Sequence, residues 1–73
     1  MSIIIGEEIK KVVKERRVTV AWLAHEIGCH RTNIYRIFNS ASIDTDILLR
    51  LSKVLHYNFF NLYSEAVSSE NNF

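Results

Sequence analysis

Apolar side chains recur along this chain at spacings of three and four residues, which is the period of an α-helix that buries one face. The pattern is clearest in the middle of the chain. There it gives the apolar faces of two short helices, Leu23, Ala24 and Ile27 in the first and Ile34, Ile37 and Phe38 in the second. Gly28 lies between them, where a helix ends most easily in a residue that accepts positive φ. The sequence therefore predicts two helices joined by a sharp turn.

The same period predicts three more helices, so the expected fold class is all-α with five helices. The expected bounds are 6–16, 20–27, 31–38, 46–55 and 59–66. Thr19 is a suitable N-cap for the second helix, and Asp44 or Thr45 for the fourth. His30 stands at the cap position of the third helix and is a poorer cap, for which Thr32 or Asn33 could partly compensate. We expect one domain over residues 1–66 and a polar, frayed tail over residues 67–73.

The polar face of the third predicted helix carries side chains that can read DNA. A short helix after a sharp turn is the unit that enters the major groove in helix-turn-helix proteins. The candidate base-contacting residues are Arg31, Thr32, Asn33, Tyr35 and Arg36. An arginine on this face can form a bidentate fork with O6 and N7 of guanine. The alternative is a solvated helix face, since any surface helix carries an arginine or two.

Charge is distributed unevenly along the chain. The net charge is only +1, but residues 9–36 hold seven basic and two acidic side chains, a balance of +5. The remaining residues hold two basic and six acidic side chains, a balance of −4. A basic half on a near-neutral chain suits a surface that meets nucleic acid. Lys10, Lys11 and Lys14 either belong to that surface or only solvate the first helix.

Backbone N–H groups at a helix start favour anions, and so does a polar loop that follows a groove-facing helix. The expected phosphate-contacting residues are accordingly Arg17, Thr19, Val20, Asn39 and Ser40. The loop over residues 39–42 lacks the lysine or arginine that often supplements such contacts. This predicts modest affinity for a single copy of the chain.

Taken in order along the chain, these motifs resemble the phage-repressor helix-turn-helix family, which includes the lambda and 434 repressors and Cro. The positions that carry the resemblance are Ile9, Leu23 with Ala24, Ile27 with Gly28, Ile34, Ile37, Leu48, Leu51, Leu55 and Leu62. The resemblance implies a DNA-binding regulator of transcription that acts on double-stranded DNA in the cytoplasm. Repression by a homodimer is the simplest role that it implies, because the chain shows no second domain for sensing or activation.

The chain departs from that family at several positions. Arg17 and Ser40 stand where the family usually has glycine, and Val20 where many members have glutamine. Val13 and Phe38 stand where the family often buries an arginine against a glutamate. Exchanging both partners of a buried ion pair for apolar side chains is often neutral or stabilising. We therefore expect Val13 and Phe38 to contact each other in the core.

Aromatic side chains exceed what one small core requires. Phe59, Phe60 and Tyr63 fall within five residues, and we expect one or two of them, most simply Phe59 or Tyr63, to face a second subunit. Trp22 either packs over the end of the first helix or is exposed to a partner. Two alternatives to a homodimeric repressor remain open. One is a protein-interaction module without DNA binding, which His30, Val20 and the loop without basic residues support, and the other is an antitoxin-like protein that also binds a second protein.

Other kinds of chemistry find little support in the sequence. His25, Cys29 and His30 are close together, but adjacent Cys29 and His30 do not have the spacing of paired zinc ligands and a fourth ligand is not evident. We expect no metal and no cofactor. No set of nucleophile, base and orienting residue is present, so an enzyme is not expected. No apolar run approaches the ~20 residues of a membrane span, and the first residues lack the features of a signal peptide.

Overall fold

Helices make up most of this protein. The computed structural model describes residues 2–71, and the side chains of residues 2–69. The helices are α1 (Ile5–Arg16), α2 (Val20–Ile27), α3 (Arg31–Phe38), α4 (Thr45–Leu55) and α5 (Phe60–Asn71). Within the described residues there is no strand, so the all-α, five-helix prediction is confirmed. The expected bounds of α2 and α3 agree with the structure, and those of α1 and α4 differ by one residue.

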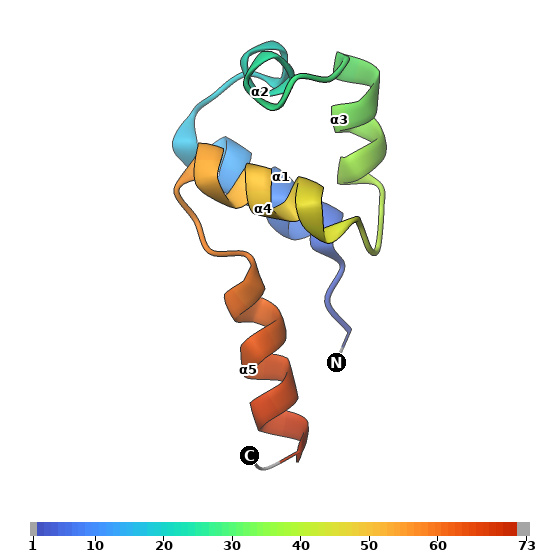
Figure 1. Cartoon of the computed structure of the whole chain (residues 1–73), viewed down its shortest axis with the longest axis vertical. Coiled ribbons are helices and arrows are strands. Elements are labelled where there is room, and N and C mark those ends of the chain that lie inside the picture. Colours follow the sequence, from blue (N-terminus) through green and yellow to red (C-terminus); the bar gives the residue numbers. More distant parts are fainter. Residues whose placement is uncertain (1, 72–73) are drawn as a thin grey trace.

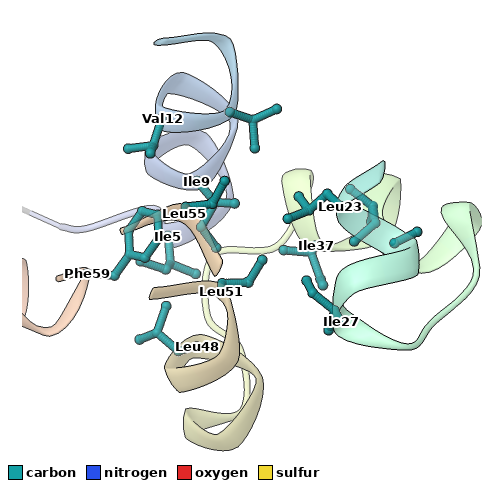
Figure 2. Packing of buried hydrophobic residues seen from close by; sticks show 13 residues of the cluster. Ile5, Ile9, Val12, Leu23, Ile27, Ile37, Leu48, Leu51, Leu55 and Phe59 are labelled. Carbon is teal, nitrogen blue, oxygen red and sulfur yellow. The ribbon is translucent and has the colours of Figure 1, made fainter. Parts of the chain in front are cut away.

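The hydrophobic core lies between α1, α2, α3 and α4. Helix α2 packs against α3 and α4, and α1 packs against the same two helices. Figure 2 shows their buried side chains meeting in one cluster. The fully buried members with the largest side chains are Ile5, Ile9, Leu23, Ile34, Leu51, Leu55 and Phe59. They repeat at helical spacing because each helix turns one apolar stripe inwards.

The ends of α1 and α4 are held together by an arginine. Arg16 Nε donates to Leu55 O at 2.9 Å, and Arg16 Nη2 donates to His56 O at 3.1 Å. These carbonyls belong to the end of α4, where backbone acceptors lack intrahelical partners. Arg17 and His56, the C-caps of α1 and α4, both adopt the left-handed conformation, with φ of 57° and 52°.

The start of α1 is fixed to the end of α3. Ile5 N–H donates to Ala41 O at 3.2 Å, and Gly6 N–H donates to Ser40 O at 2.9 Å. A Cβ atom at Gly6 would lie 2.7 Å from Phe38 C and still closer to the carbonyl oxygens of Ile37 and Phe38. Glycine is therefore required here by the close approach of two backbones.

Helix α5 extends away from the other four helices (Figure 1), and the molecule measures 40 × 21 × 20 Å. The expected end of this helix at residue 66, followed by a frayed tail, is wrong, because α5 continues to Asn71. No proline or glycine interrupts residues 60–71, and Leu62, Ala66 and Ser69 line a hollow with the N-terminal residue Ile3. Residues 72 and 73 of the predicted tail lie outside the described residues.

Candidate nucleic-acid interface

The turn between α2 and α3 is closed by backbone hydrogen bonds around Gly28. This residue has a φ of 81°, and its N–H donates to Ala24 O at 2.9 Å and to His25 O at 3.2 Å. Cys29 N–H also donates to Ala24 O, at 2.9 Å. Because a Cβ at Gly28 would meet nothing within 4 Å, glycine serves here for its backbone conformation. The predicted sharp turn is confirmed.

His30 caps the start of α3 with its own side chain. Nδ1 accepts from Thr32 N at 3.4 Å and lies 2.5 Å from Thr32 Oγ1. The imidazole of His30 thus does what a serine or threonine side chain usually does at this position.

The polar residues of α3 face solvent on the side opposite its buried stripe. Ile34 is fully buried and Ile37 is 8% exposed, whereas Arg31, Thr32, Asn33, Tyr35 and Arg36 are all exposed. At about 100° per residue, all of these except Asn33 share an arc of about 140°. Asn33 lies at the edge of that arc, towards α4, where it lines a hollow with Arg36 and Arg50. The structure thus gathers four of the five predicted base-contacting residues on one exposed face, with Asn33 at its edge.

The start of α2 offers backbone donors beside that face. Thr19 Oγ1 accepts from Trp22 N at 3.0 Å, and the first bond within the helix runs from Leu23 N to Thr19 O. The N–H groups of Val20 and Ala21 therefore have no acceptor within the helix. The N–H of Val20 is among the phosphate donors that the sequence predicts, and the N–H of Ala21 lies next to it in the chain.

Ser40, a predicted phosphate contact, uses its donors within the protein. Its hydroxyl donates to Arg36 O at 2.7 Å and its N–H donates to Ile37 O at 3.0 Å, so both of its donors close the end of α3. Asn39 Nδ2 similarly donates to Tyr35 O at 3.0 Å, but its amide keeps a second N–H. Asn39 thus retains a donor for phosphate and Ser40 does not.

Two lysines of α1 lie beside the predicted interface. Lys10 and Lys14 line a hollow of about 330 Å³ together with Val20, Tyr35 and Asn39, which are predicted DNA contacts from α2, α3 and the following loop. Lys11 is one residue from Lys10 but lies 3.7 Å from Glu8, with which it forms an ion pair.

On the opposite side of α3, Arg50 of α4 shares a hollow of about 310 Å³ with Arg36. Arg50 is not predicted as a candidate from the sequence, because its position beside Arg36 depends on how α4 packs. Among residues 2–71, no group of three side chains suited to hold a metal ion lies together. Cys29 is half-buried and its thiol is free.

A scan against family models matches residues 8–62 to the Cro/C1-type HTH DNA-binding domain. The chain belongs to this family. The matched region contains the whole of α2, α3 and α4, and with them the turn at Gly28 and the exposed face of α3. No curated protein and no solved structure matches the chain.

In a Cro/C1-type domain, the exposed polar face of α3 belongs to a DNA-binding fold. The family consists of DNA-binding domains rather than enzymes, and the predicted resemblance to phage repressors is confirmed. The domain therefore has DNA as its partner. In the described part of the chain, no helix has both the length and the apolar character needed to cross a membrane.

The residues predicted for a dimer interface divide into buried and exposed ones. Phe59 is fully buried in the core, and its ring packs against that of Tyr57 at a tilt of 53° with the centroids 4.8 Å apart, so the expectation that it meets a second subunit is wrong. Phe60 is half-buried against the core, and Tyr63 is 36% exposed. Of these predicted interface residues, Tyr63 keeps the most surface for a partner.

Trp22 is 41% exposed and lines a hollow of about 490 Å³ between the ends of α1 and α4. Arg16 and Val18, at the end of α1, and Val54 of α4 share this hollow. The indole thus lies beside the end of α1, as expected if Trp22 packs over that helix. It also keeps a large exposed area, as expected if it meets a partner.

Proposed function

We propose that this Cro/C1-type domain is a sequence-specific regulator of transcription in the cytoplasm, which binds double-stranded DNA as a homodimer and represses by occluding its operator. The observation that carries the proposal is the exposed face of α3, where two arginines, a threonine and a tyrosine share one arc beside the start of α2. A face of this kind suits the major groove, where each base pair presents a distinct pattern of donors and acceptors.

Each residue of the face has a proposed role in reading bases. Arg31 and Arg36 each take O6 and N7 of a guanine, which is the commonest specific contact in the major groove. Thr32 meets a base through its hydroxyl or a thymine through its methyl group. Asn33 and Tyr35 border these contacts and reach either bases or the adjacent phosphates.

Phosphate contacts surround this face. We propose that the N–H group of Val20, the amide of Asn39 and the side chains of Arg17 and Thr19 hold the DNA backbone. Lys10 and Lys14 join them, because they line the same hollow as Val20 and Asn39. The α1 lysines thereby supply the positive charge that the loop over residues 39–42 lacks.

The lysine contacts can be tested by salt titration. Neutralising a residue that contacts phosphate should reduce the slope of log affinity against log salt by about 0.9. We expect this change for Lys10→Gln and for Lys14→Gln. Lys11→Gln is the matched control, since it removes the same charge from a lysine that pairs with Glu8 and does not line the hollow shared with Val20 and Asn39. Equal changes in this slope for all three variants would show that the lysines act only through the electrostatic field of the whole protein.

We propose that the homodimer forms through α5. Phe60, Tyr63 and Ala66 fall on one side of this helix, and the helix projects from the rest of the domain (Figure 1). One helix face buries less than the ~1,600 Å² of a standard interface, so the dimer should be weak alone and complete on DNA. Tyr63→Asp should abolish cooperative binding to two half-sites while leaving single half-site binding intact, measured by sedimentation with and without DNA.

The proposed function is tested by selecting bound sites from random duplexes. We expect a pseudo-palindrome whose half-sites lie about one helical turn, roughly 10 base pairs, apart. A single unpaired half-site, bound independently by each copy, would contradict the homodimer. A selection that enriches no sequence would contradict specific recognition.

A second candidate function keeps the fold and adds a protein partner, as an antitoxin does. The large hollow beside Trp22 favours it, because an exposed indole next to half-buried valines suits an interface. A Trp22→Gln variant separates the two functions. It should retain full affinity for purified DNA if the hollow serves only a protein partner.

A further inference from the structure

The imidazole of His30 lies against both the hydroxyl and the backbone N–H of Thr32, and these two contacts together favour one tautomer of the ring. Nδ1 is 2.5 Å from Thr32 Oγ1 and 3.4 Å from Thr32 N. A backbone N–H can only donate, so Nδ1 must offer it a lone pair rather than a proton. The ring proton of neutral His30 therefore resides on Nε2.

This tautomer leaves Thr32 with one orientation of its hydroxyl. A hydroxyl has one proton and two acceptor positions. With no proton on Nδ1, the Thr32 O–H donates to it at 2.5 Å and shares the single lone pair of Nδ1 with the more distant backbone N–H. The hydroxyl then has only acceptor positions left for a base. Thr32 is exposed on the DNA-facing arc of α3, so those positions face the groove.

We infer that His30 makes Thr32 a dedicated hydrogen-bond acceptor, which selects an amino base over a keto base on the contacted strand. In the major groove, adenine N6 and cytosine N4 donate, whereas guanine O6 and thymine O4 accept. An accepting hydroxyl therefore pairs with adenine or cytosine. The inference rests on the DNA binding proposed above. It adds that His30, which caps α3 and contacts no base itself, sets the base preference of Thr32.

The arrangement of protons can be tested without DNA by NMR at mildly alkaline pH. Nitrogen-15 shifts of the ring should show His30 more fully in the Nε2–H form than the exposed His25. The Thr32 hydroxyl proton should exchange with water more slowly than that of the exposed Thr45. A ring proton on Nδ1 of His30, or equally fast exchange at both threonines, would overturn the inference whether or not the chain binds DNA.

The consequence for specificity is tested by site selection with two variants. His30→Ser keeps a good N-cap and releases the Thr32 hydroxyl to donate, and Thr32→Val removes the hydroxyl but keeps the shape. For the unaltered chain we expect adenine or cytosine to be favoured about three- to tenfold at one position. His30→Ser should lose this preference at that position alone, with unfolding in urea confirming the fold.

Thr32→Val should lose the same preference, which keeps the test decisive if His30→Ser folds poorly. Selection of guanine or thymine at the Thr32 position by the unaltered chain would overturn the inference. An unchanged preference in either variant would also overturn it. These outcomes differ from failure of the proposed function, in which the unaltered chain enriches no sequence at all.

Discussion

Substitution by alanine should destabilise this protein more at Gly6 than at Gly28. The local sequence suggests the reverse. Gly28 has the left-handed backbone of a turn, and Gly6 lies in the first turn of α1. Propensity alone predicts that Gly6→Ala stabilises the helix by up to ~1 kcal/mol. Packing predicts the reverse, because a Cβ at Gly6 meets the backbone carbonyls of Ile37 and Phe38, which cannot rotate away.

The cost of Gly6→Ala can be worked from the structure. Overpacking against a rigid neighbour costs ~1–3 kcal/mol. Moving α1 away from α3 also weakens the bonds from Ile5 to Ala41 and from Gly6 to Ser40, each worth ~0.5–1.5 kcal/mol. After the gain in propensity, the free energy of unfolding should fall by ~2–4 kcal/mol. Gly28→Ala has open space and should cost only the ~1–2 kcal/mol of a left-handed alanine.

Urea unfolding followed by the fluorescence of the chain's single tryptophan measures both variants. A domain of this size should have a total stability of roughly 4–11 kcal/mol, so Gly6→Ala removes a large part of it. The same variant should weaken DNA binding, because Gly6 sets the position of the end of α3. A Gly6→Ala protein as stable as the unaltered chain would refute the close approach of α1 and α3.

Three further predictions concern arginines. Arg36→Ala should cost ~1–3 kcal/mol on the selected site and relax preference at one base pair, which competition binding with single-base variants measures. Arg16→Met should lower the free energy of unfolding by ~1–2 kcal/mol in urea, because it removes the two bonds to the end of α4; an unchanged midpoint would show that those bonds contribute nothing in solution. Arg17→Gly should raise the free energy of unfolding by ~0.5–1 kcal/mol, because glycine relieves the left-handed backbone at this position. It should also weaken DNA binding by one phosphate contact. A rise in both the free energy of unfolding and the affinity for DNA would show that Arg17 makes no such contact.

Local signals explain why the helix-turn-helix could be predicted from the sequence. Thr19 and Gly28 cap α2 through bonds within a few residues, so their chemistry is visible in the chain itself. Helical spacing likewise marked Ile34 and Ile37 as buried and left the polar residues of α3 outside. These features depend on neighbouring residues rather than on how the helices pack.

Features that depend on packing could not be predicted. Phe59 and Tyr63 look alike in the sequence, yet only the docking of the α4–α5 connection buries Phe59. Ser40 looks like a loop donor until its hydroxyl is seen bonded to Arg36 O. Lys10 becomes distinguishable from Lys11 only when α1 is placed beside α3.

The most direct test of α3 as a recognition helix is the ratio of two dissociation constants. A duplex carrying the selected site and a shuffled duplex of the same composition are titrated at physiological salt. The account predicts binding to the selected site at least ~10³-fold tighter than to the shuffled duplex, the lower end for specific DNA-binding proteins. Equal affinity for both duplexes would contradict it, because the residues of α3 would then contact DNA without reading its sequence.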